Sequence, residues 1–139
     1  MKIYVDVNIL IDIASERRGW QQSTVIMAKV QNTPLIGYIS SLTVVLLYLR
    51  LEKIFTKKDA REFAQELISG FKILPLTTEI LQEAFTHQIE DFEDAIQFIS
   101  AQKVSCDEII TRDKDFEIMK GQCKIYTPEE YIREYGSGC

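Results

Sequence analysis

The chain has 139 residues, of which 46% are hydrophobic and 10% aromatic, enough to fill one sizeable core but not two. We therefore expect one domain over residues 1–135 and a flexible tail over 136–139. The net charge of −5 argues against broad, nonspecific binding to nucleic acid, which needs clustered Lys and Arg. Asp6 and Asp12 interrupt the apolar start, so we expect no membrane span and a soluble, cytoplasmic protein.

Strand and helix signals alternate through the first half of the chain. The expected elements are a strand over residues 3–5, helices over 9–13 and 21–30, a strand over 38–40 and a helix capped by Ser41 or Thr43 that extends to Ile54. This last helix is apolar nearly all round between Val44 and Leu51. We expect it in the core or at a subunit interface, and we predict a symmetric dimer.

The second half continues the alternation. The expected elements are a helix from the cap Thr56 to Gly70, a strand over 72–76, helices over 78–87 and 92–102, strands over 108–111 and 123–126, and a final helix capped by Thr127. Pro75 places its strand near a sheet edge or near the strand's end. Short apolar strands separated by helices predict a three-layer α/β/α sandwich with a mainly parallel central sheet.

Three aspartates follow strands or begin helices in this arrangement. Asp6 closes the first strand, Asp94 lies in the first turn of a helix, and Asp115 comes just after the strand over 108–111. Sites in open α/β sheets form beyond the carboxyl ends of the strands, so these side chains can meet in space. Clustered carboxylates repel one another unless a cation lies between them, and oxygen ligands favour Mg²⁺ or Mn²⁺ over zinc.

Such a site suits hydrolysis of a phosphodiester bond, because a carboxylate-held ion polarises the phosphate and orients a water. The charge distribution agrees with this use. No Lys or Arg occurs from Leu74 to Gln102, whereas basic residues gather at Arg50–Arg61 and Arg112–Lys124. Each aspartate also has an ordinary structural explanation as a helix cap or turn residue. A phosphatase-like enzyme ranks lower, since no nucleophile motif is present.

The cysteines and the single histidine suggest no other chemistry. Cys106, Cys123 and Cys139 are an odd number without CxxC spacing, which argues against a disulfide framework and a zinc site. We expect them to be reduced and structural. His87 has no orienting partner nearby in the sequence, and we assign it no role.

Three segments of the chain resemble, in order and separation, the acidic motifs of the PIN domain family. The run Tyr4–Leu10 is similar to that family's strand-ending Asp-x-Asn signature, and Asp91–Gln97 and Ile109–Phe116 are similar to its central and late acidic motifs. The resemblance extends over the whole chain. It implies a metal-dependent ribonuclease fold, found often in the toxin of bacterial VapC-type toxin–antitoxin pairs, and with it an RNA substrate, a small antitoxin partner and a homodimer.

The resemblance also assigns roles to individual residues. Those it implies are Asp6, Asp94 and Asp115 as metal-binding acids, Asp91 and Asp113 as helpers through water or a second metal, Asn8 as a positioner of Asp6, and Thr111 as a support of the acidic turn. One position departs from the family. Leu46 stands where many members have a glutamate. Either Asp91, Asp113 and water complete the metal shell, or the chain is a catalytically weak or inactive module that binds RNA or protein.

Overall fold

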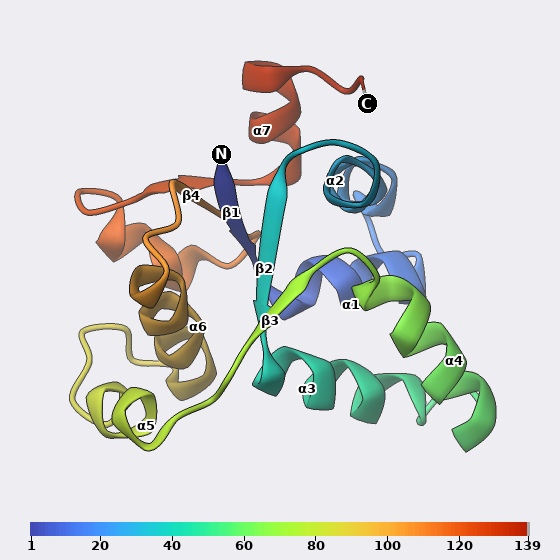
Figure 1. Ribbon diagram of the computed structural model, residues 1–139, viewed down its shortest axis with the longest axis horizontal. Coiled ribbons are helices and arrows are strands. Elements are labelled where there is room, and N and C mark those ends of the chain that lie inside the picture. The colour runs from blue at the N-terminus through green and yellow to red at the C-terminus, as the bar shows by residue number, and fades with distance from the viewer. Residues whose placement is uncertain (139) are drawn as a thin grey trace.

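The centre of the molecule is a five-stranded, fully parallel sheet, seen in a computed structural model that describes residues 1–138 (Figure 1). The strand order is β3-β2-β1-β4-β5. The strands are β1 Lys2–Val5, β2 Ile36–Ser40, β3 Lys72–Leu74, β4 Glu108–Ile110 and β5 Lys124–Tyr126. The prediction for Cys139 concerns a residue outside the described range.

Helices cover both faces of this sheet (Figure 1). They are α1 Val7–Ser15, α2 Trp20–Asn32, α3 Ser41–Leu51, α4 Lys57–Ile68, α5 Thr78–Ala84, α6 Phe92–Lys103, the 3-10 helix η1 Lys114–Met119 and α7 Pro128–Tyr135. Helices α1 to α4 and α7 share one apolar core with the sheet, and α5, α6 and η1 share a second. The predicted three-layer α/β/α sandwich is therefore confirmed.

The central strand β1 contributes to both cores. Ile3 and Val5 point into the core of α1 to α4, Tyr4 points into the core of α6, and all three are fully buried. Successive side chains of a strand point to opposite faces, so a strand covered on both faces needs an unbroken apolar run. This is why β1 could be recognised in the sequence without any polar alternation.

The start of α3 differs from the prediction. Ser40, rather than Ser41 or Thr43, caps this helix, and its Oγ accepts a hydrogen bond from the Leu42 N–H at 3.1 Å. As the last residue of β2, Ser40 already has the extended backbone that an N-cap requires. The Ser41 hydroxyl instead accepts from the Leu76 N–H at 3.0 Å and ties the chain after β3 to α3.

Helix α3 is buried on one side only. Leu47 and Leu51 are fully buried, whereas Val45 and Ile54, just past its end, are each 55% exposed. The helix ends at Leu51, three residues before the predicted Ile54. An apolar surface therefore remains uncovered in the chain as described.

The predictions for the second half are confirmed in part. Strand β3 lies at the sheet edge, as Pro75 predicted, but it ends at Leu74, two residues before the predicted Leu76. Thr127 and Glu130 form the expected reciprocal cap of α7, with N–H to oxygen distances of 3.0 and 3.1 Å. Helix α5 ends at Ala84 instead of His87, whose Nδ1 accepts from the Ile89 N–H at 3.0 Å. Within residues 1–138, each helix is too short or too polar to cross a membrane.

Candidate metal centre

The acidic residues gather where β1 and β4 end side by side. Val5 is paired with Ile110, and the Asp6 N–H donates to the Ile110 carbonyl at 3.0 Å. Helix α1 begins directly after Asp6, which is its N-cap. Because the strands are parallel, their carboxyl ends share one edge, and the segments that follow them start from the same place.

Three of the predicted site residues are helix N-caps. The Asp6 side chain accepts from the Asn8 N–H at 3.4 Å, Asp91 accepts from the Asp94 N–H at 3.0 Å, and Asp113 accepts from the Asp115 N–H at 2.9 Å. Aspartate suits this position because its carboxylate satisfies a backbone N–H that has no partner inside the helix. Each cap also fixes an acidic turn at this edge of the sheet, so the structural explanation does not compete with a role at the site.

Asp6 is fully buried and held by side chains from two other elements. Its Oδ1 accepts from Gln97 Nε2 at 3.0 Å, and its Oδ2 accepts from Thr111 Oγ1 at 2.7 Å. The same Thr111 hydroxyl accepts from the Asp113 N–H at 2.9 Å. Burial raises the pKa of Asp6, and the donated hydrogen bonds partly offset that rise. Thr111 thus connects the first acidic residue to the late acidic turn.

Gln97 is a site residue to which the sequence analysis gave no role. It is 1% exposed, and its Oε1 accepts from the Val7 N–H at 3.1 Å and from the Tyr4 hydroxyl at 3.3 Å. Its two-sided amide thus holds Asp6 with one end and the start of α1 with the other. The available signal was its position three residues after Asp94, as a polar residue within an otherwise mainly apolar and buried part of α6.

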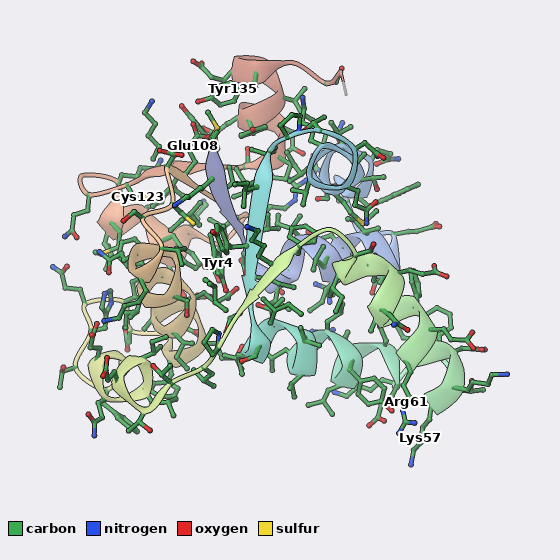
Figure 2. All side chains as sticks on the ribbon, viewed as in Figure 1. Tyr4, Lys57, Arg61, Glu108, Cys123 and Tyr135 are labelled. Carbon is green, nitrogen blue, oxygen red and sulfur yellow. The ribbon has the colours of Figure 1, made fainter. Side chains whose placement is uncertain are left out.

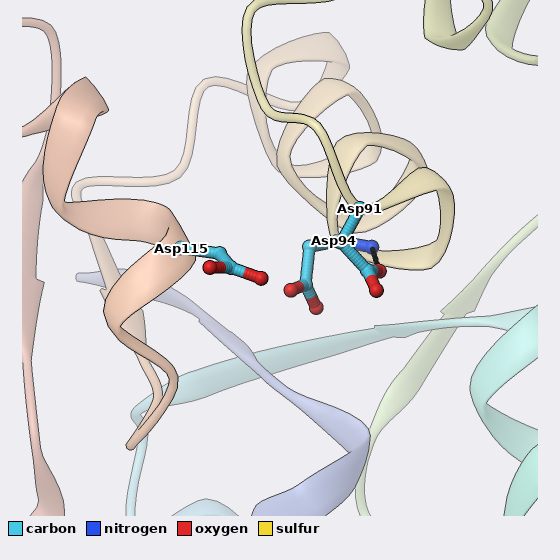
Figure 3. A group of neighbouring side chains, drawn as sticks. All are labelled: Asp91, Asp94 and Asp115. Carbon is cyan, nitrogen blue, oxygen red and sulfur yellow. Dashed lines mark hydrogen bonds between the residues drawn. The ribbon is translucent and has the colours of Figure 1, made fainter.

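Asp91, Asp94 and Asp115 point toward one another from α6 and η1 (Figure 3). Each offers one carboxylate oxygen, and the three oxygens lie within 4.8 Å of one another. Asp94 is buried, whereas Asp91 and Asp115 are exposed, so the group opens to solvent. Among residues 1–138 this is the one carboxylate group of that size, and Asp6 does not belong to it.

Asp6 and Asp113 nevertheless act on this group electrostatically. Burial is the main cause that raises the pKa of Asp94 to about 9, followed by a hydrogen bond with the Asp113 carboxyl and by the charges of Asp6, Asp113 and Asp91. Without a counterion, Asp94 therefore retains a proton at neutral pH. A divalent cation removes this repulsion, and an all-oxygen set of donors fits Mg²⁺ or Mn²⁺.

Arg112 anchors the turn between Thr111 and Asp113 to two segments that are distant in the sequence. Its Nη2 donates to the Gly19 carbonyl at 2.8 Å and to Glu129 Oε2 at 2.7 Å, and its Nη1 also donates to Glu129. Gly19 has a φ of 85°, and a Cβ there would lie 2.6 Å from Arg112 Nη2. The acidic turn is thus connected to the start of α2 and to α7.

Helix α3 supplies no carboxylate to the centre. Leu46 is half-buried and lines a recess together with Asn8 and Glu93. The sequence of α3, Ser41–Leu51, contains no acidic residue. The negative charge at this edge therefore comes from the residues after β1 and β4 and from the start of α6.

These features define a class of α/β proteins with an acidic centre at the carboxyl edge of a parallel sheet. The sequence profile of the PIN domain matches residues 2–115, and the chain belongs to the PIN domain family. This confirms the resemblance seen in the three acidic segments.

Similar proteins extend over nearly the full chain. Ribonuclease VapC1 of Aquifex aeolicus (strain VF5) is 25% identical in an alignment 142 residues long, which covers 98% of this chain and 96% of that protein. A toxin–antitoxin complex from Klebsiella pneumoniae contains a chain that is 26% identical, with a TM-score of 0.67 and coverage of 91% of this chain and 97% of that one. The structure of Mycobacterium tuberculosis VapC20, a sarcin-ricin loop cleaving toxin, shares the fold, with a TM-score of 0.68, 16% identity and coverage of 84% and 93%.

Proposed function

We propose that this protein is a divalent-metal-dependent endoribonuclease of the VapC toxin type, acting on RNA in the cytoplasm. The observation that carries the proposal is the convergence of Asp91, Asp94 and Asp115 at a solvent-open edge, with their oxygens within 4.8 Å. A relative that is named as a ribonuclease, and that aligns with this chain over almost the full length of both proteins, supports the proposal. The net charge of −5 does not argue against RNA binding at this site, because a bound cation neutralises the acidic edge locally.

In this proposal Asp94 and Asp115 bind Mg²⁺ or Mn²⁺, and Asp91 lies within the same reach. Asp6 keeps a part in ligation. A carboxylate has about four acceptor sites, and Asn8, Gln97 and Thr111 occupy two on Oδ1 and one on Oδ2. One site on Asp6 Oδ2 therefore remains for an ion.

The remaining residues of the centre act by holding these acids in place. Thr111 and Gln97 fix both oxygens of Asp6, so its carboxylate does not have to reorganise when charge develops nearby. Asp113 holds the N-terminus of η1, from which Asp115 projects. When bound, the ion supplies polarisation of the scissile phosphate and activation of a water for in-line attack.

The test is incubation of purified protein with mixed RNAs in Mg²⁺, in Mn²⁺ and in EDTA, alongside Asp6→Asn and Asp94→Asn variants. We expect cleavage with either metal, none in EDTA and a loss of at least 100-fold in each variant, about what removal of a charge-stabilising group costs. Glu62→Gln, which removes one exposed charge on α4, serves as the matched control. Cleavage that ignores both EDTA and the aspartate substitutions would rule out the mechanism.

A second candidate function is a noncatalytic PIN module that binds RNA or protein. The observation in its favour is Leu46, which leaves α3 without a carboxylate at the centre. This candidate predicts that the wild type binds RNA but cleaves none of it in either metal. Leu46→Glu would then be expected to strengthen Mn²⁺ binding, measured by calorimetry.

A small antitoxin is the protein partner that we propose. The solved toxin–antitoxin complex from Klebsiella pneumoniae matches 91% of this chain at 26% identity. We expect a segment of such a partner to bind near Asp94 and Asp115 and to prevent RNA cleavage. Co-expression with the product of a neighbouring small gene, followed by co-purification and a cleavage assay, tests this partnership.

A homodimer is the oligomeric state that we propose. Val45 and Ile54 are each 55% exposed, which leaves part of the surface around α3 apolar. Association of two copies would remove this surface from water. Sedimentation should show a dimer at micromolar concentration, and Val45→Glu should shift it to monomer; a wild type that sediments only as monomer would contradict the proposal.

A further inference from the structure

A recess of about 280 Å³ lies between α1 and α3. Its floor is aliphatic and is made by Val7 and Ile11 of α1 and by Leu46 and Leu49 of α3. The two helices are in contact with each other (Figure 1). The volume is near the lower limit for small-molecule pockets, which suits one nucleotide.

One end of the recess lies beside the acidic centre. Asn8 and Glu93 both line it. The Asn8 N–H donates to Asp6, and Glu93 lies between Asp91 and Asp94 in the first turn of α6. This end of the recess therefore lies next to the segments that carry Asp6, Asp91 and Asp94.

The α3 side of the recess carries two cations. Arg50 and Lys53 are exposed and line it. Within residues 1–138, neither has a carboxylate within 4.0 Å, in contrast to Arg112, which is paired with Glu129. Two cations without protein counterions beside an aliphatic floor match a nucleotide, which has an anionic phosphate and a base with apolar faces.

The positive surface continues away from the acidic centre. Lys57 and Arg61 lie together at the start of α4, beyond the end of α3 (Figure 2). Both are exposed. A strand that left the recess past Lys53 would therefore meet further cations, whereas the opposite direction leads to the aspartates.

We propose that this recess binds the unpaired nucleotide next to the cleaved phosphodiester of a single-stranded RNA. The base lies on the floor of Leu46 and Leu49, and its phosphate contacts Arg50 and Lys53. The assignment rests on the proposed ribonuclease function and adds to it a preference for unpaired RNA. Base recognition in RNA occurs mainly in single-stranded segments, whose faces are open to contact.

The test measures binding of a short, fluorescein-labelled single-stranded RNA of mixed sequence in Mg²⁺, using Asp94→Asn as the noncleaving parent. Adding Arg50→Gln and Lys53→Gln should remove both side-chain contacts to this one phosphate. The plot of log K against log salt concentration should then become shallower by about 0.7, since each neutralised phosphate of a single strand contributes about 0.7. Lys124→Gln with Arg133→Gln removes the same pair of residue types from exposed positions on β5 and α7 and should leave the slope unchanged.

The aliphatic floor is tested separately. Leu49 is 46% exposed, so Leu49→Ala should not impair folding. It should weaken RNA binding without changing the salt slope, because it removes contact with the base rather than with the phosphate. The same RNA annealed into a duplex should bind more weakly than the single strand to the parent protein.

Binding and cleavage together distinguish the outcomes. If the Arg50 and Lys53 variant binds RNA with the slope and affinity of its parent while the wild type still cleaves RNA, the recess is not the RNA site and the proposal is overturned. A protein segment would then be its occupant. If the substitutions weaken RNA binding but the wild type cleaves nothing, the ribonuclease function fails, and the recess remains an RNA-binding site of a noncatalytic module.

Discussion

Replacement of Asp94 by asparagine should stabilise the protein in the absence of divalent ions and make it insensitive to them. The carboxyl of Asp94 is buried, and the surrounding acids raise its pKa from 3.8 to about 9. Folding at pH 7 therefore requires this side chain to bind a proton that the unfolded chain has released. Asparagine is nearly isosteric and carries no charge, so it removes this requirement.

The expected stabilisation follows from the difference in proton binding between the folded and unfolded chains. Between pH 3.8 and 7, each pH unit costs about 1.36 kcal/mol, which amounts to an upper limit of about 4 kcal/mol for Asp94. For a chain of this size that upper limit corresponds to about 14 °C in the melting temperature. Since the folded-state pKa is raised, the difference between variant and wild type should grow as pH rises above 3.8 and vanish below it.

Thermal unfolding in EDTA and in excess Mn²⁺ measures both effects. At a concentration 100 times the dissociation constant, Mn²⁺ should stabilise the wild type by about 2.7 kcal/mol and leave the Asp94→Asn variant unchanged. Glu62→Gln, with an exposed carboxyl on α4, should follow the wild type under both conditions. An Asp94→Asn variant that melts at a lower temperature than the wild type in EDTA would refute the electrostatic account of this centre. So would an Asp94→Asn variant that Mn²⁺ stabilises as much as it stabilises the wild type.

Four further substitutions test contacts around the centre and at the opposite end of β4. Thr111→Val removes the hydroxyl that donates to Asp6; it should cost about 1–3 kcal/mol in urea unfolding and reduce cleavage beyond the loss of folded protein. Arg112→Gln should lower the free energy of unfolding by about 2 kcal/mol. Arg112 also lowers the pKa of Glu129 below 4.5. The wild type should therefore be more stable than Glu129→Gln at neutral pH, and this difference in stability should disappear as pH falls through the lowered pKa. Glu108 is 1% exposed and burial raises its pKa above 4.5, so Glu108→Gln should raise the unfolding midpoint at pH 7 and change it little near pH 4.

Each of these expectations has a contrary result. Equal cleavage per folded molecule would limit Thr111 to a structural role. Equal unfolding curves for Arg112→Gln and wild type would show that the contacts to Gly19 and Glu129 contribute nothing measurable. A loss of stability at pH 7 in Glu108→Gln would show that the Tyr135 hydroxyl, which donates to Glu108 (Figure 2), outweighs the cost of burial.

The sheet could be predicted because its signals are local. The apolar run over residues 3–5 is what a strand buried on both faces requires, and Thr127 and Glu130 reveal a helix start through contacts three residues apart. The placement of Asp6 and Asp94 near the sheet edge followed from the alternation of strands and helices. The family resemblance added the order of the acidic segments.

The contacts that hold the centre together were not predictable in this way. Gln97 reaches Asp6 across 91 positions, and Arg112 reaches Gly19 across 93. Such contacts depend on how β1, α6 and β4 are stacked, and many polar residues on helices have no comparable partner. The cap of α3 is Ser40, because the last residue of a strand has the extended backbone that an N-cap needs. Ser41 and Thr43 lie inside the helix and have helical backbone.

The position of β1 in the middle of the sheet determines when the centre can assemble during synthesis. This strand precedes the other four strands in the chain, and one of its two neighbours, β4, ends only at Ile110. At a translation rate of roughly 5–20 residues per second, about 5–20 s separate the emergence of Asp6 from that of Asp115. A ribosome making this protein therefore carries a chain whose acids remain apart until the segment with Asp115 has emerged.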